Sequence, residues 1–131
     1  GGIADAEGVV AVLRLGAIAA QVGTAYLLCD EATSAIHRRA LTSADAEHTA
    51  LTNVFTGRPA RGIVNRIMRE QGPISASAPP FPLATSAVAP LRAKAEAAGN
   101  GDFSPLWSGQ NASGCRAVSA AEMTRSLCAL V

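Results

Sequence analysis

Gly1-Gly2-Ile3-Ala4-Asp5 and Gln21-Val22-Gly23-Thr24 are the two stretches that decide the fold predicted for this chain. Between them lie one helix-like stretch and one short apolar run, which together have the length of one βα unit. This layout is typical of the end of a (β/α)8 barrel, where the loops after strands seven and eight close on a phosphorylated ligand. The sequence therefore predicts an α/β fold that starts in the loop after strand seven and lacks the upstream part of the barrel.

Both glycine-containing loops suit an anion. Gly1 and Gly2 have no Cβ, and their N–H groups precede a predicted helix N-terminus, where the helix dipole favours negative charge. Gly23 repeats the arrangement, and Thr24 adds a hydroxyl donor. The alternative is that these glycines only form tight turns. Two such loops one βα unit apart favour a shared phosphate site.

The residues between the loops predict a helix and then a strand. Residues 6–15 are helical in pattern, with Asp5 as the N-cap and Gly16 as the C-terminal stop. Residues 17–22 are apolar and bounded by glycines, which predicts a buried parallel strand. We place the end of the barrel at residues 1–32.

The rest of the chain predicts a smaller α+β segment over residues 33–86 and C-terminal helices over 87–131. The final helix follows the capping box Ser119-Ala120-Ala121-Glu122, with Met123, Leu127 and Leu130 as its apolar stripe. Pro90 is expected in the first turn of the helix before it. The other expected elements are a helix at 33–41, a strand at 49–55, a turn at 57–59, a helix from about 64 to 70, an extended proline-rich connector at 72–82 and a helix at 87–98.

Composition excludes several functional classes. The 131 residues carry a formal net charge of +1, which gives no reason to expect nucleic acid. Three cysteines at wide spacing form neither a disulfide framework nor a metal motif, so we expect small buried residues in a cytoplasmic protein. No apolar stretch approaches the ~20 residues of a membrane helix. The first residue is not Met, which favours a missing upstream segment.

The two loops resemble the last barrel loops of the nitronate monooxygenases, FMN enzymes once called 2-nitropropane dioxygenases. The resemblance extends to nearly the whole chain, through Phe55-Thr56-Gly57-Arg58-Pro59-Ala60-Arg61-Gly62 and Leu106-Trp107-Ser108-Gly109-Gln110. It implies the C-terminal part of a TIM-barrel flavoenzyme, with the last one to two βα units and most of a smaller α+β lid domain. The residues it implies as FMN contacts are Gly1, Gly2, Gln21, Gly23 and Thr24.

The resemblance also implies where catalysis resides. The family's catalytic histidine belongs to an upstream loop, and no residue here matches it, so no catalytic residue is expected in this chain. His37 and His48 lie in polar stretches and are expected on solvated helix faces. Trp107 and Gln110 are candidates for a pocket over the flavin, and a core role for Trp107 is the alternative. Cys29 has no adjacent base and is not expected to be a nucleophile.

The activity implied is the oxidation of alkyl nitronates with O2 to a carbonyl compound and nitrite. One alternative is an FMN-dependent NAD(P)H reductase that acts on quinones or an enoyl thioester on the same barrel. Another is a non-catalytic fragment that persists only with the missing N-terminal barrel segment or by self-association, because unpaired strand edges invite association.

Two arginines flank Pro59 in a rigid corner. Arg58 and Arg61 either contact substrate or cofactor anions, or they hydrogen-bond carbonyl and carboxylate groups to fix the turn. We favour the structural role, because Pro59, Gly57 and Gly62 together are typical of a fixed turn.

Overall fold

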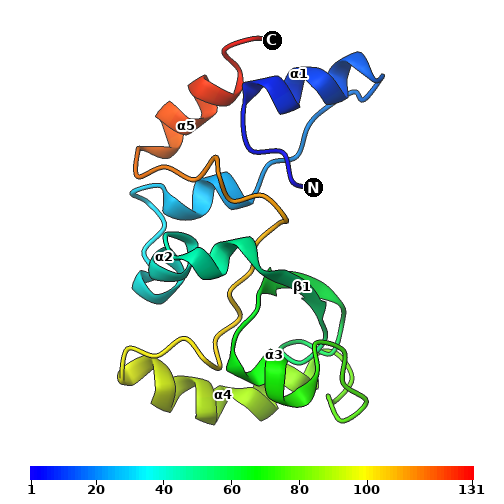
Figure 1. The fold of residues 1–131 in the computed structure, drawn as a ribbon, viewed down its shortest axis with the longest axis vertical. Helices are drawn as coiled ribbons and strands as arrows, with labels where there is room; N and C mark the ends of the chain where they lie inside the picture. The colour runs from blue at the N-terminus through cyan, green and yellow to red at the C-terminus, as the bar shows by residue number, and fades with distance from the viewer.

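The computed structural model describes all residues from 1 to 131 and shows a mixed α/β chain (Figure 1). The N-terminal and C-terminal helices pack at one end of an elongated molecule, and the strands lie with two helices at the other end. None of the helices has the length and hydropathy needed to cross a membrane. The elements in order are α1 (Ala6–Arg14), η1 (Thr24–Leu28), α2 (Ala35–Leu41), η2 (Ala44–Glu47), β1 (Thr49–Thr52), β2 (Ala60–Ile63), α3 (Arg66–Gln71), α4 (Leu83–Ala97) and α5 (Ala120–Leu127).

The terminal helices α1 and α5 begin at the predicted caps. Asp5 Oδ1 accepts a hydrogen bond from Gly8 N at 2.8 Å, and Ser119 Oγ accepts one from Glu122 N at 3.2 Å. The predicted stripe of the last helix is correct for Met123 and Leu127, which are buried, and wrong for Leu130, which is 60% exposed. Leu130 lies beyond Leu127, the last residue of α5, so it does not belong to the apolar face of this helix. The core at this end consists of Val9, Ala25, Cys29, Met123 and Leu127.

The strand predicted at residues 17–22 is absent from this structure. The segment has no strand partner, and the side chain of Ile18 is fully exposed. A parallel strand forms only where neighbouring strands accept and donate its main-chain hydrogen bonds. The sheet of this structure is instead a two-stranded antiparallel pair of β1 and β2. An apolar run alone therefore did not suffice to form the predicted strand.

The antiparallel pair lies over a second core. Its register runs from Thr49 opposite Ile63 to Thr52 opposite Ala60. The strand predicted over 49–55 ends early, because the following residues turn inward and bury Val54 and Phe55. The predicted helix from about 64 is present as α3, which buries Ile67 and Met68 against these two side chains.

Gly57 and the proline-rich connector meet at one tight contact. Gly57 has a φ of +86°, and a Cβ placed on it would collide with the main chain of residues 79–81. Thr85 Oγ1 donates to Phe55 O at 3.0 Å and holds the start of α4 against the same corner. α4 begins four residues before the predicted start, so Pro90 lies inside the helix and not in its first turn.

Candidate functional site

The two glycine-containing loops meet at a third segment, at Gly109. Gly109 N donates to Thr24 Oγ1 at 2.8 Å. A Cβ built on Gly109 would lie 3.3 Å from Thr24 Oγ1 and 3.6 Å from Gly2 N. Three segments far apart in the sequence therefore converge, and we call these residues the Gly2–Thr24–Gly109 cluster.

Main-chain donors at this cluster have no main-chain acceptor, and the backbone of its glycines is open to approach. A Cβ added at Gly1, Gly2 or Gly23 would meet no atom within 4 Å, and Gly2 has a φ of +80°, which favours glycine. The N–H groups of Gly2, Gly23 and Thr24 donate to no main-chain acceptor. Because Thr24 Oγ1 accepts from Gly109, its own proton is available for another acceptor. The arrangement can therefore donate several hydrogen bonds to an anion.

The remaining predicted contacts lie beside this cluster. Gly23 is the residue before η1, and Gln21 is exposed two positions earlier. The structure thus brings Gly2 and Thr24 to the same residue, Gly109. It leaves the Gln21 side chain open to solvent. The N–H groups at the start of η1 are the donors that a short helical turn leaves unpaired.

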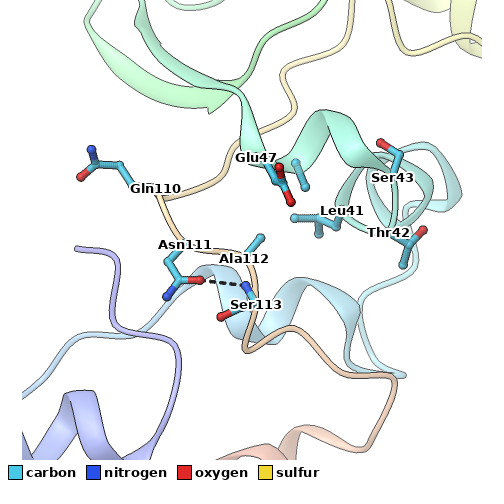
Figure 2. Close-up of a pocket in the computed structure, with 9 residues that line it drawn as sticks. Leu41, Thr42, Ser43, Glu47, Gln110, Asn111, Ala112 and Ser113 are labelled. Carbon is cyan, nitrogen blue, oxygen red and sulfur yellow. Dashed lines mark hydrogen bonds between the residues drawn. The ribbon is translucent and has the colours of Figure 1, made fainter.

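Trp107 and Gln110 lie in different surroundings. The Trp107 ring meets Phe55 edge to face, with ring centroids 5.6 Å apart, and it packs against the core of Val54, Phe55, Ile67 and Met68. This contact supports the core role that was the alternative for Trp107. Gln110 borders a cavity of about 420 Å³ (Figure 2). The other residues that line it are Leu41, Thr42, Ser43, Ala46, Glu47, Asn111, Ala112 and Ser113.

The sequence predicts His37 on a solvated helix face, and this prediction is wrong. Its ring is half-buried, and Nε2 lies 2.7 Å from the carbonyl oxygen of Trp107. Burial lowers the pKa of His37, and the hydrogen bond to the Trp107 carbonyl acts in the opposite direction. The helix face that carries His37 packs toward the segment containing Trp107 and Gly109. His48 is exposed, as predicted.

Gly109 and Gly114 are site residues that the sequence did not single out. Gly109 lies within a stretch that carried the family resemblance, and a close approach between backbones is the usual reason for glycine there. A Cβ on Gly114 would collide with the carbonyl group of Ala4, so glycine at this position lets the N-terminal loop pack closely against residue 114. Neither contact could be inferred from local sequence, because each joins segments about 100 residues apart.

The three cysteines differ in their surroundings. Cys29 is buried, and burial raises its pKa, with the nearby Glu31 and Asp30 carboxylates adding to the effect. Burial also raises the pKa of Cys115, whose Sγ donates to Thr24 O at 3.1 Å. A raised pKa disfavours the thiolate, which is the nucleophilic form, so neither thiol is activated for nucleophilic attack. Cys128 is exposed, contrary to the expectation that all three are buried. No His, Cys, Asp and Glu side chains are grouped so as to hold a metal ion.

The two arginines of the corner make different contacts. Arg61 Nη1 donates to the carbonyl oxygen of Thr49 at 3.2 Å, as the structural role predicts. The guanidinium carbon of Arg58 lies 4.4 Å from the centroid of the Phe81 ring, so Arg58 stacks on an aromatic side chain and does not bond a carbonyl. Both side chains stabilise the corner, by two different interactions.

Comparisons with known proteins match almost the whole chain. The family model described as nitronate monooxygenase matches residues 1–129. The nitronate monooxygenase of Pseudomonas aeruginosa is 43% identical over 97% of this chain and 37% of its own length. The nitronate monooxygenase of Paraburkholderia phytofirmans is 38% identical over 97% of this chain and 35% of its own length.

A solved structure agrees with these sequence relatives. It comes from a study of nitroalkane oxidase from Streptomyces ansochromogenes, and it is 42% identical with a TM-score of 0.87. The match covers 98% of this chain and 37% of that chain. This chain therefore spans about a third of the length of the relatives it matches.

Proposed function

The chain belongs to the nitronate monooxygenase family, and from that premise we propose that it is the C-terminal part of an FMN-dependent enzyme. The proposed reaction is the oxidation of alkyl nitronates with O2 to a carbonyl compound and nitrite. In this proposal the missing two thirds of the relatives' length supplies the rest of a TIM barrel and the catalytic base. Residues 17–22 would then form its last strand, beside the missing ones.

The observation that supports this proposal is the Gly2–Thr24–Gly109 cluster. A phosphate offers only acceptors to a binding site at its anionic oxygens, and the cluster presents unpaired N–H groups together with the Thr24 hydroxyl. The open space at Gly1, Gly2 and Gly23 lets an anion approach the main chain. These residues therefore fit the phosphate of FMN, with the exposed Gln21 amide as a further donor.

Each part of the chain has a distinct task in the proposal. The glycine loops bind and orient the phosphate, and the electron transfer is supplied by FMN when it is bound. Gln110 follows Gly109 directly in the sequence and borders the cavity described above, and Trp107 fixes that segment through its contact with Phe55. Proton abstraction is assigned to the part of the enzyme that precedes this chain.

The first test concerns the phosphate site in the complete protein. Gly23→Val places a side chain where the phosphate must approach, and it should weaken FMN binding by about 2–4 kcal/mol. Flavin retention after dialysis measures this, with the exposed Ala121→Val on α5 as the control. The melting temperature of the flavin-free variant should stay unchanged, because a Cβ added at Gly23 meets no atom within 4 Å. Unchanged flavin retention would contradict the phosphate site.

The second test concerns the reaction. Under anaerobic conditions an alkyl nitronate should reduce the enzyme's flavin rapidly, and turnover in air should release nitrite. Rapid reduction by NAD(P)H, with none by the nitronate, would instead identify a reductase built on the same barrel.

A further inference from the structure

Residues 106–109 form an extended segment that runs along β2 as a third strand would. Ile63 N donates to Leu106 O at 2.8 Å, and Ser108 N donates to Arg61 O at 3.2 Å. These two bonds fix one edge of the segment to the sheet. They do not reach Gly109, the residue that contacts the proposed phosphate site.

The opposite edge of this segment is held by two side chains. In an extended chain the main-chain groups of alternate residues point to opposite edges, so those of 107 and 109 face away from β2. His37 Nε2 lies 2.7 Å from the Trp107 carbonyl oxygen, and Thr24 Oγ1 accepts from Gly109 N at 2.8 Å. His37 therefore contacts the main chain at Trp107, two residues before Gly109, which contacts Thr24 and lies beside Gly2.

The hydrogen bond defines the state of the ring. A carbonyl oxygen only accepts, so Nε2 must carry the proton and donate it. His37 lies on α2, whose N-terminus is capped by Ser34 Oγ and whose Leu41 is buried in the core. The ring is thus attached to an anchored helix, and its donor atom is fixed in place beside the segment.

We propose that His37 is a positioning residue for the phosphate site: by donating to Trp107 O it keeps Gly109 against Thr24 and Gly2. This inference rests on the proposed function. Without the donor, the half-buried carbonyl of Trp107 loses its partner and the 106–109 segment relaxes away from α2. The distances within the Gly2–Thr24–Gly109 cluster would then no longer be held, and the N–H groups that face the phosphate would lose their alignment.

The test compares two nearly isosteric variants of the complete protein. His37→Met removes the donor, whereas His37→Gln keeps an N–H at a similar reach. The measurements are amide hydrogen exchange of residues 106–110 in the flavin-free protein and the FMN dissociation constant from fluorescence quenching. His37→Met should raise both the exchange rate and the dissociation constant by about tenfold, the loss of one hydrogen bond, and His37→Gln should restore most of each.

Arg39→Ala is the matched control. Arg39 lies on the same helix, and its Nη2 also donates to a distant carbonyl, Gly99 O, at 2.7 Å. That bond does not involve the 106–109 segment, so Arg39→Ala should leave FMN affinity and exchange at 106–110 unchanged. An equal effect of Arg39→Ala would show that general destabilisation of α2 explains the result and would overturn the proposal.

The outcomes separate this proposal from the proposed function. If Gly23→Val loses FMN while His37→Met binds FMN like the wild type, the positioning role of His37 fails alone. If Gly23→Val also retains FMN, the phosphate site fails and this inference fails with it. If His37→Met does not fold, His37→Asn replaces it, because its amide is too short to reach Trp107 O and should give the same rise in the dissociation constant.

Discussion

At Gly57 an added methyl group would collide with the main chain of residues 79–81, whereas at Gly23 it would meet no atom within 4 Å. Gly57 belongs to the region of β1, β2 and α3, where Val54, Phe55, Ile67 and Met68 form a buried core. Ile63 and Met68 there are each 1% exposed. Gly23 belongs to the N-terminal loops, where Leu15 is 87% exposed and Ile18 is fully exposed.

The difference shows two opposite uses of glycine. At Gly57 glycine permits close packing and a left-handed φ, so its role is structural. At Gly23 it leaves space for something that is not part of the chain, which supports a ligand-binding role. The same contrast applies to large apolar side chains. Val54, Phe55, Ile63, Ile67 and Met68 of the first region are buried. Leu15 and Ile18 after α1 are exposed, and in our proposal they contact the rest of the complete enzyme.

The sharpest test of this comparison is one substitution at the two glycines. Gly57→Ala should destabilise the protein by about 2–5 kcal/mol, because it adds backbone strain at positive φ and a collision with main-chain atoms. Gly23→Ala, the matched control, should leave the free energy of unfolding of the flavin-free protein unchanged. Urea unfolding measures both. A Gly57→Ala variant within 1 kcal/mol of the wild type would contradict the tight contact.

A charge at Ile18 tests whether the exposed segment is buried in the complete protein. If residues 17–22 form a barrel strand there, Ile18→Asp should cost about 2–4 kcal/mol, the penalty for burying an unpaired charge. In the 131-residue chain alone the same change should have no effect, because the side chain is fully exposed. Equal unfolding free energies of wild type and variant in the complete protein would contradict the barrel proposal.

Local signals in the sequence were enough to predict several elements. The caps at Asp5 and Ser119 and the stop at Gly16 depend on neighbouring residues only, and the structure confirms them. The helix at 33–41 and the connector after Gly72 were predicted for the same reason. The prediction of a strand at 17–22 is wrong for this structure. A strand needs a partner that local sequence does not specify, and no segment of this chain pairs with residues 17–22.

The candidate site was predictable only in part. The glycines and Thr24 carry a local signature, and the structure brings Gly2 and Thr24 together. The role of Gly109 as the link and the inward orientation of His37 depend on contacts over about 70 to 85 residues of sequence. The polar neighbours of His37 predict a solvated face, whereas in the structure the 106–109 segment packs against this face of α2.

The pH dependence of stability should reveal the burial of His37. Because burial lowers its pKa in the folded state, the unfolded chain, with the ordinary value of 6.5, binds a proton that the folded chain resists. The free energy of unfolding should therefore fall as pH drops below about 6.5. This loss should be smaller in His37→Gln. Urea unfolding at pH 7.5 and 5.5 compares them, and identical losses would contradict the buried ring.

The smallest effects are expected at the corner, where two arginines can be compared directly. Arg61→Ala removes part-buried hydrogen bonds to the carbonyl and hydroxyl oxygens of Thr49 and should cost about 1–2 kcal/mol. Arg58→Ala removes an exposed stacking contact on Phe81 and should cost about 0.5–1 kcal/mol. Thermal unfolding should show this order.

The kinetics of Arg58→Ala then decide whether the corner is purely structural. If Arg58 only stacks on Phe81, the variant should show a slightly lower melting temperature and an unchanged KM for nitronate, because no substrate contact is lost. If Arg58 instead binds the anionic substrate, KM should rise at unchanged kcat, the pattern of lost uniform binding.

Phe81→Leu is the informative companion variant, since it removes the stacking partner and leaves the guanidinium free. A structural Arg58 makes the two single variants and the double variant nearly equal in stability, because each removes the same contact. A substrate-binding Arg58 would leave the KM of Phe81→Leu close to that of the wild type while that of Arg58→Ala rises, and it would assign the corner to the site and not to the packed half of the molecule.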